Sequence, residues 1–229
     1  MRAADLEAAF ASLPPAWAAV LPGWTLERLW AVQRRVEAVS ADRPIAPEDP
    51  FRALRLVAPA DVKVVVIGQD PYPSPGHADG LAFSAGHGRP RSLARIFEVL
   101  AADRPGRFEP PEVWKLDAWA SRGVLLLNPV LTVEVGRSGS HHACGWQALT
   151  AEIVQVLARY PDPPVSLLWG SKAQAFWADA VSGGKATALC TRHPAYDFRR
   201  AFMAEGSHFE ATAERVDWWA VGKRESPVL

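Results

Sequence analysis

One stretch of the chain combines a carboxylate with aromatic side chains. In residues 68–72 (GQDPY), the glycine permits a sharp turn and the proline restrains Asp70 to extended backbone. Tyr72 and Phe83 follow, and Phe83 offers a flat face on which a ring could stack. A carboxylate beside such surfaces suits cleavage of a bond from a sugar to a planar leaving group, because it can stabilise a sugar cation and orient water. A structural turn with a capping aspartate explains the same spacing equally well.

Four further polar residues could complete such a site. Asn128 could read the edge of a base, because an amide carries both a donor and an acceptor. His193 could donate to an oxygen of a departing ring or act as an acid. Ser92 and Ser171 stand where helix N-caps are expected, and helix N-termini can bind phosphate. Taken singly, each residue also fits an ordinary structural role in a strand end, a loop or a helix cap.

Apolar runs lead into most of these positions. Buried parallel strands read as near-continuous apolar runs, and parallel sheets place ligands beyond the carboxyl ends of their strands. We therefore predict that Asp70, Asn128, Ser171 and His193 converge on one cleft. The predicted strands are Val62–Ile67, Val124–Leu127, Val165–Trp169 and Ala186–Cys190.

Helical patterns alternate with these strands. The alternation predicts a three-layer α/β/α fold with a central, mainly parallel four-stranded sheet. We expect a single domain over residues 1–229, with residues 1–50 forming a helical and looped segment packed on it. The predicted helices are Trp24–Val39 (with Leu26, Leu29, Trp30 and Val36 at helical spacing), two that follow Ser92 and Ser171, Trp114–Ser121, Gly145–Tyr160 and Phe209–Val221.

Composition excludes several classes of protein. Apolar residues make up 49% of the chain, which argues against global disorder, and no apolar stretch approaches the roughly 20 residues of a membrane helix. Two cysteines build no disulfide framework, so we expect a reducing, cytoplasmic location. A formal net charge of zero argues against binding nucleic acid by bulk charge alone. A local basic rim remains available from Arg137, Lys172, Arg192, Arg199 and Arg200.

We expect neither a metal nor a cofactor. His141 and His142 are adjacent, so they share no helix or strand face, and no carboxylate or cysteine lies at convincing ligand spacing. No glycine-rich phosphate or dinucleotide motif follows the first predicted strand. Among the other histidines, His77 could line the site.

Several motifs together resemble family 1 uracil-DNA glycosylases. GQDPY followed by PGHADGLAFS resembles the water-activating motif of that family. Residues 125–136 (LLLNPVLTVEVG) resemble its uracil-reading strand and loop, and residues 167–174 (LLWGSKAQ) its Gly-Ser phosphate loop. His193-Pro194, with residues 207–209 downstream, resembles its last DNA-contacting segment. The similarity keeps one order from about Leu13 to Trp219.

The resemblance implies a function and roles for the matching residues. The chain would be a monomeric DNA repair glycosylase that flips deoxyuridine out of single- or double-stranded DNA and hydrolyses its N-glycosidic bond. Asp70 would orient water and stabilise the sugar cation, and His193 would stabilise charge on the departing uracil. The remaining implied roles are main-chain contacts to uracil from Gln69, exclusion of thymine by Tyr72, stacking by Phe83, hydrogen bonding of the uracil edge by Asn128, and phosphate contacts from Ser92, Ser171 and Ser207.

Departures from the family pattern indicate a divergent subgroup. Pro73 stands where the family usually has a histidine that helps to hold water or phosphate, and Asp79 replaces a common histidine. Residues 193–198 read HPAYDF where the family has HPSPLS, so Asp197 takes the place of the leucine that fills the gap left by the flipped base. The candidates to fill that gap are Tyr196, Phe198 and Arg199, and Arg199 and Arg200 are also candidates for DNA binding.

Three other functions stay open from the sequence. A remodelled pocket could accept hypoxanthine, xanthine or other damaged bases. Pro73 and Asp197 also suit a DNA-damage-binding module with little turnover. A protein for small nucleotides on the same α/β scaffold is the third alternative.

Overall fold

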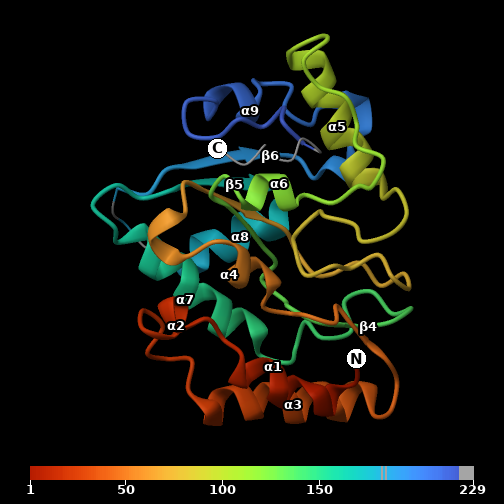
Figure 1. The fold of residues 1–229 in the computed structure, drawn as a ribbon, viewed down its shortest axis with the longest axis vertical. Helices are drawn as coiled ribbons and strands as arrows, with labels where there is room; N and C mark the ends of the chain where they lie inside the picture. The colour runs from red at the N-terminus through yellow and green to blue at the C-terminus, as the bar shows by residue number, and fades with distance from the viewer. Residues whose placement is uncertain (182, 184, 222–229) are drawn as a thin grey trace, which may run out of the picture.

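The computed structural model describes residues 1–181, 183 and 185–221 of the chain (Figure 1). Its central sheet has four parallel strands in the order β3-β2-β5-β6, with Ile67 in register with both Leu127 and Leu168. This sheet confirms the predicted fold class. The strands are β2 (Val64–Ile67), β3 (Val124–Leu127), β5 (Val165–Trp169) and β6 (Ala188–Thr191).

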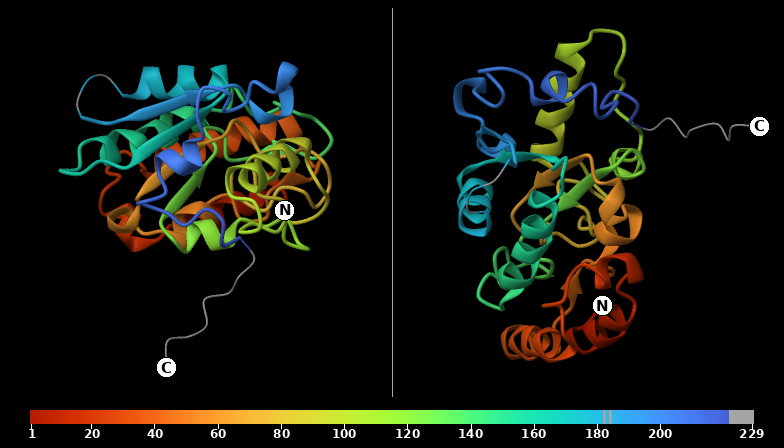
Figure 2. Two further views of the ribbon diagram at one scale, coloured as in Figure 1. Left: turned by 90° about the horizontal axis from the view of Figure 1, so that it is seen from above. Right: turned by 90° about the vertical axis from the view of Figure 1, so that its left-hand side faces the viewer.

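Helices cover both faces of the sheet. The left view of Figure 2 shows α8 above the strands and α4 and α6 below them. The helices are α1 (Leu6–Ala11), α2 (Pro15–Ala18), α3 (Leu26–Ser40), α4 (Arg52–Leu56), α5 (Arg91–Asp103), α6 (Asp117–Ala120), α7 (Trp146–Ala158), α8 (Ser171–Ala180) and α9 (His208–Ala211). A small antiparallel pair joins β1 (Ile45–Ala46) to β4 (Val133–Glu134).

The strand sequences explain why the sheet is central. Every residue of β2 and β3 is buried, as their unbroken apolar runs predict. The edge strand β6 is only half-buried, and its Cys190 is exposed. The face of α7 formed by Trp146, Leu149, Ile153 and Leu157 is fully buried, as its spacing predicts.

The N-terminal helices pack at one end of the molecule, opposite α5 and α9 (Figure 1). The ring of Phe10 lies 6.3 Å from that of Trp146, so aromatic contacts join α1 to α7. Helical spacing does not bury all four residues named for this helix, because Leu26 and Trp30 are 54% and 41% exposed. The buried stripe of α3 passes instead through Leu29, Val32, Val36 and Ser40.

The boundaries of four helices differ from prediction. Ser92 and Ser171 are not N-caps, since Pro90 and Gly170 hold those positions and both serines lie within the first turn. The predicted helix Trp114–Ser121 is limited to Asp117–Ala120. The predicted helix Phe209–Val221 ends at Ala211, and the following segment turns so that the adjacent Trp218 and Trp219 are both buried.

In the described part of the chain, no helix has both the length and the apolar character needed to cross a membrane. The same residues include no group of three or more histidine, cysteine, aspartate or glutamate side chains placed to hold a metal ion.

Candidate active site

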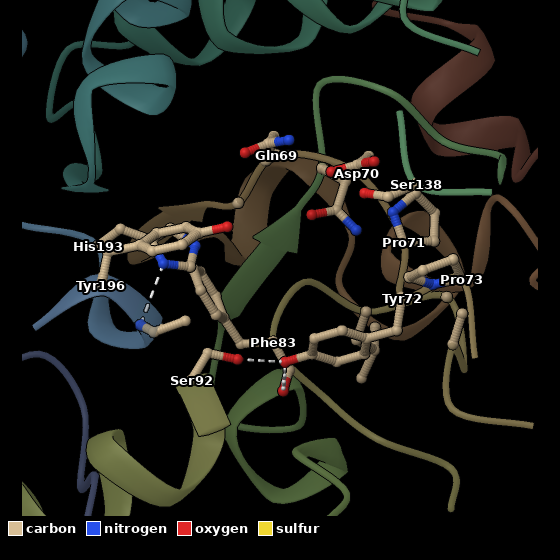
Figure 3. Close-up of a pocket in the computed structure, with 16 residues that line it drawn as sticks. Gln69, Asp70, Pro71, Tyr72, Pro73, Phe83, Ser92, Ser138, His193 and Tyr196 are labelled. Carbon is tan, nitrogen blue, oxygen red and sulfur yellow. Dashed lines mark hydrogen bonds between the residues drawn. The ribbon is translucent and has the colours of Figure 1, made fainter. Parts of the chain in front are cut away.

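A cavity of about 200 Å³ opens beyond the carboxyl ends of β2 and β3 (Figure 3). Asp70, Asn128 and His193, from separate parts of the chain, all line it. In Figure 3, Asp70 and Tyr72 lie on one side of the cavity and His193 on the other. The further lining residues include Gln69, Pro71, Pro73, Phe83, Ser92, Ser138 and Tyr196. The small volume suits a single planar group rather than a drug-sized ligand, which typically needs roughly 300 Å³ or more.

The carboxylate of Asp70 is held at the end of β2. Its Oδ2 accepts a hydrogen bond from the backbone N–H of Gly139 over 3.0 Å, and its side chain is only 9% exposed. The neighbouring carbonyl of Gln69 accepts from the N–H of Val130 over 3.2 Å, which ties this turn to the segment after β3. Asp70 therefore presents a charged group in a fixed place within a partly desolvated site, where electrostatic effects are strong.

Asn128 reaches the cavity because residue 68 has no side chain. A Cβ at Gly68 would lie 2.2 Å from Asn128 Oδ1 and 3.0 Å from Ala82 Cβ. The N–H of Gly68 also donates to the carbonyl of Leu127 over 2.9 Å, continuing the pairing of β2 with β3. The glycine thus brings the amide of Asn128 close to the turn that carries Asp70.

Tyr72 is locked in place by its hydroxyl group. That hydroxyl donates to the carbonyl of Phe83 over 3.1 Å and lies 2.7 Å from Ser92 Oγ. Burial raises the pKa of Tyr72, so the phenol stays neutral. Phe83 has a left-handed backbone (φ 64°), and its ring centroid lies 5.1 Å from Trp169. A non-glycine residue at such a φ is uncommon and is often found at functional sites.

His193 is a half-buried, neutral imidazole. Burial lowers its pKa, and its Nδ1 accepts from the N–H of Ala195 over 3.1 Å. The proton of the neutral ring is therefore assigned to Nε2, which makes that atom a donor. A Cβ at Gly170 (φ 108°) would lie 2.9 Å from His193 Cβ, so the glycine makes room for this residue. The ring centroid lies 5.8 Å from Phe83.

The predicted phosphate-contacting serines are placed differently. Ser92 lines the cavity, but it is buried and its hydroxyl group contacts Tyr72. Ser171 does not line the cavity itself but an adjoining hollow that shares His193 and Tyr196 with it. Ser207 caps α9 by accepting from the N–H groups of Phe209 and Glu210. Neither Ser207, Arg199 nor Arg200 lines the cavity.

The loop after His193 has an inward carboxylate and outward aromatic rings. Asp197 accepts from Arg95 Nε over 2.5 Å and from the N–H of Phe202 over 2.6 Å, and its side chain is 7% exposed. Tyr196 and Phe198 are 72% and 78% exposed. Arg199 is exposed beside them, and Arg200 pairs with Glu98 Oε2 over 2.7 Å.

Two other departures from the family pattern have structural partners. Asp79 accepts from Ser84 Oγ over 2.6 Å and pairs with Arg52 over 3.2 Å, so it holds its loop in place. The carbonyl of Pro73 accepts from the N–H of Gly136 over 2.8 Å. His77 does not line the cavity, although its ring packs edge-on against Tyr72.

The sequence did not predict that Ser138 and His142 lie near Asp70. Ser138 lines the cavity, and His142 Nε2 lies 3.5 Å from Asp70 Oδ2. Nothing in the local sequence of this loop points to Asp70, which lies about 70 residues earlier. The only signal in the sequence is the glycine-rich, polar character of the loop between β4 and α7, which is typical of loops that carry functional residues.

Comparison with known proteins supplies independent information. The model of the uracil DNA glycosylase superfamily matches residues 55–217. A uracil-DNA glycosylase of Bordetella petrii is 44% identical over 231 residues, covering 97% of this chain and 89% of that protein. One from Bordetella parapertussis is 45% identical over 195 residues, covering 83% and 76%. The crystal structure of the mimivirus uracil-DNA glycosylase, 24% identical, matches 80% of this chain and 69% of that one with a TM-score of 0.68.

Proposed function

The chain belongs to the uracil DNA glycosylase superfamily, and from this membership we propose that it excises uracil from DNA in repair. The reaction is hydrolysis of the N-glycosidic bond of deoxyuridine. The bond electrons leave with uracil, the oxygen of water forms the new bond to the sugar, a proton of that water ends on the released uracil, and an abasic site remains. A base reaches so enclosed a cavity only after it is flipped out of the stack.

One observation carries the proposed chemistry: a carboxylate, an amide and a neutral imidazole line one small cavity with an aromatic ring. Phe83 stacks on the flipped base, and Asn128 hydrogen-bonds its edge. His193 donates from Nε2 to the uracil oxygen on which negative charge develops. Asp70 stabilises the positive charge on the sugar and orients the attacking water.

The remaining roles concern selectivity and DNA contact. Tyr72 excludes the methyl group of thymine, and its hydrogen-bonded hydroxyl group supports this role. Gln69 contacts uracil through its main chain. Ser92, Ser171, Ser207, Arg199 and Arg200 approach the DNA backbone; the hollow lined by Ser171 adjoins the cavity through His193, which supports a continuous DNA path there.

The working form of the protein is also a proposal. We propose one domain that acts as a monomer in the cytoplasm on single- or double-stranded DNA. Packing of Phe10 against Trp146 supports the inclusion of the N-terminal segment in that domain. The free thiols of Cys144 and Cys190 suit a reducing compartment.

Excision from a labelled deoxyuridine oligonucleotide, single- and double-stranded, tests the function in the presence of a chelator. We expect the wild type to release uracil, and Asp70→Asn to lower the single-turnover rate by at least about two orders of magnitude. Asp42→Asn, at an exposed acidic residue, is the matched control and should keep the wild-type rate. Absence of uracil release by the wild type refutes the function, and an unchanged rate in Asp70→Asn removes that residue from its role.

A further inference from the structure

The loop between β4 and α7 brings a second imidazole to the carboxylate of Asp70. His142 Nε2 lies 3.5 Å from Asp70 Oδ2. This nitrogen is buried, and it has no hydrogen-bond partner among the residues that the structure describes. A buried polar atom without a partner in a native protein calls for an explanation, and a role at a functional site is a common one.

The backbone of the loop holds the imidazole in this place. The N–H of Gly139 donates to Asp70 Oδ2 over 3.0 Å, and the N–H of His142 donates to the carbonyl of Gly139 over 3.2 Å. Gly139 has a left-handed backbone (φ 71°), and a Cβ on it would lie 3.5 Å from His142 Cε1. The ring of His142 therefore packs against the bare side of Gly139, and both residues face the same carboxylate oxygen.

The neighbouring histidine has a different environment. His141 is fully buried, and its ring nitrogens contact Thr132 Oγ1 and Ser40 Oγ at 2.9 and 2.8 Å. Both of its nitrogens are thus satisfied within the core. His142 is the member of the pair whose side chain is partly exposed (34%) and turned toward Asp70.

A proton on His142 Nε2 would face Asp70 Oδ2 in both the imidazolium and the neutral Nε2–H form. Together with the N–H of Gly139, this gives Oδ2 two donors. Oδ1 has no protein partner within the described ranges. A separation of 3.5 Å is long for a hydrogen bond, but catalytic contacts often tighten only when substrate binds. Holding one oxygen stops the carboxylate from rotating and leaves the other for water.

We propose that His142 is a positioning residue that fixes the carboxylate of Asp70 through Oδ2, so that Oδ1 orients the attacking water. This inference rests on the proposed glycosylase function. His142 contacts neither the base nor the sugar in this assignment, and it acts through Asp70 alone.

Single-turnover excision, measured over a range of protein concentrations, tests the assignment. We expect His142→Gln to lower the maximal rate about tenfold, equivalent to ~1.4 kcal/mol of activation free energy. The protein concentration at half-saturation should not change, because substrate binding does not use this residue. His87→Gln, at an exposed histidine outside the cavity, is the matched control and should keep the wild-type rate. His142→Asn should show the same loss of rate. Circular dichroism of both variants checks that they are folded, so that a loss of rate is not due to misfolding.

A double-mutant cycle with Asp70→Asn distinguishes positioning from an independent effect. In the Asp70→Asn background, followed over longer times, His142→Gln should cause a much smaller further loss, because the carboxylate that it positions is gone. An equal loss in both backgrounds, a wild-type rate in folded His142→Gln, or a change confined to half-saturation would each overturn the assignment. Failure of the wild type to release uracil would instead refute the proposed function.

Discussion

The hydroxyl group of Ser92, on α5, lies 2.7 Å from that of Tyr72, which lines the same cavity. The Tyr72 proton points to the carbonyl of Phe83, so Ser92 is the donor in the pair. This contact joins the first turn of α5 to the side chain that we propose excludes thymine. We therefore infer that Ser92, which was expected to bind phosphate, also supports the proposed base selection by Tyr72.

Removing that support should relax base selection. We expect Ser92→Ala to reduce the uracil-to-thymine excision ratio by about twofold to thirteenfold, the effect of a hydrogen bond worth about 0.5–1.5 kcal/mol. Tyr72→Ala should reduce the ratio further, since it removes the ring itself. Ser121→Ala, at an exposed serine on another helix end, is the control. A panel of oligonucleotides containing uracil, thymine, hypoxanthine or xanthine measures the ratio, and an unchanged ratio in Tyr72→Ala would count against this role.

The close approach of Gly68 to Asn128 predicts a strong effect of one added methyl group. A Cβ at position 68 would meet Asn128 Oδ1 and Ala82 Cβ in a packed site. We expect Gly68→Ala to lower the free energy of unfolding by about 1–3 kcal/mol, as overpacking does, and to displace the amide and slow excision. Urea unfolding and single-turnover rates check both effects. Gly106→Ala adds a methyl group where no atom lies within 4 Å, but its left-handed backbone (φ 79°) costs stability by itself, so this control applies to the excision rate, which it should leave unchanged.

The exposed rings of Tyr196 and Phe198 are candidates to fill the gap left by a flipped base. Asp197 between them is held inward by Arg95 and cannot serve as that wedge. We expect Phe198→Ala and Tyr196→Ala to slow excision from duplex DNA more than from single strands, because a single strand has no stacked gap to fill. The ratio of the two rates is the measurement. Equal losses on both substrates in both variants would exclude a wedge role.

The buried His141 predicts a pH-dependent stability. Trp146 Nε1 donates to Thr132 Oγ1, which contacts His141 Nδ1, while His141 Nε2 contacts Ser40 Oγ. Because Thr132 Oγ1 accepts from Trp146, its own proton is free to point to Nδ1, an arrangement that suits a neutral ring. Burial lowers the pKa of His141 from 6.5 to about 4.

The unfolded chain therefore binds more protons at His141 between pH 6.5 and 4, and stability falls as the pH falls through this window. We expect this residue to contribute a loss of about 1–2 kcal/mol in unfolding free energy between pH 8 and pH 5. The free energy of unfolding, measured with urea across that range, should change less with pH in His141→Gln than in the wild type. His208, whose pKa burial also lowers to about 4, keeps part of the dependence in both proteins. Parallel curves of unfolding free energy against pH for the wild type and His141→Gln would contradict the prediction.

The sequence by itself determined the fold class and the family. Unbroken apolar runs predict buried parallel strands, and this property depends only on the residues within each run. The carboxyl ends of such strands lie at one edge of the sheet, so the positions of Asp70 and Asn128 just after two of these runs are enough to predict their common cleft. The motifs that these residues belong to also predict the family, which the comparisons confirm.

Only the tertiary structure decided how individual side chains are oriented in the loops. The place of His142 beside Asp70, the contact of Ser92 with Tyr72 and the inward turn of Asp197 all depend on partners that are remote in the sequence. Helix ends were mispredicted for a related reason, since Trp218 and Trp219 are both drawn into the core. Local pattern reports which residues avoid water, whereas the direction of a loop side chain is set by whichever distant segment packs against it.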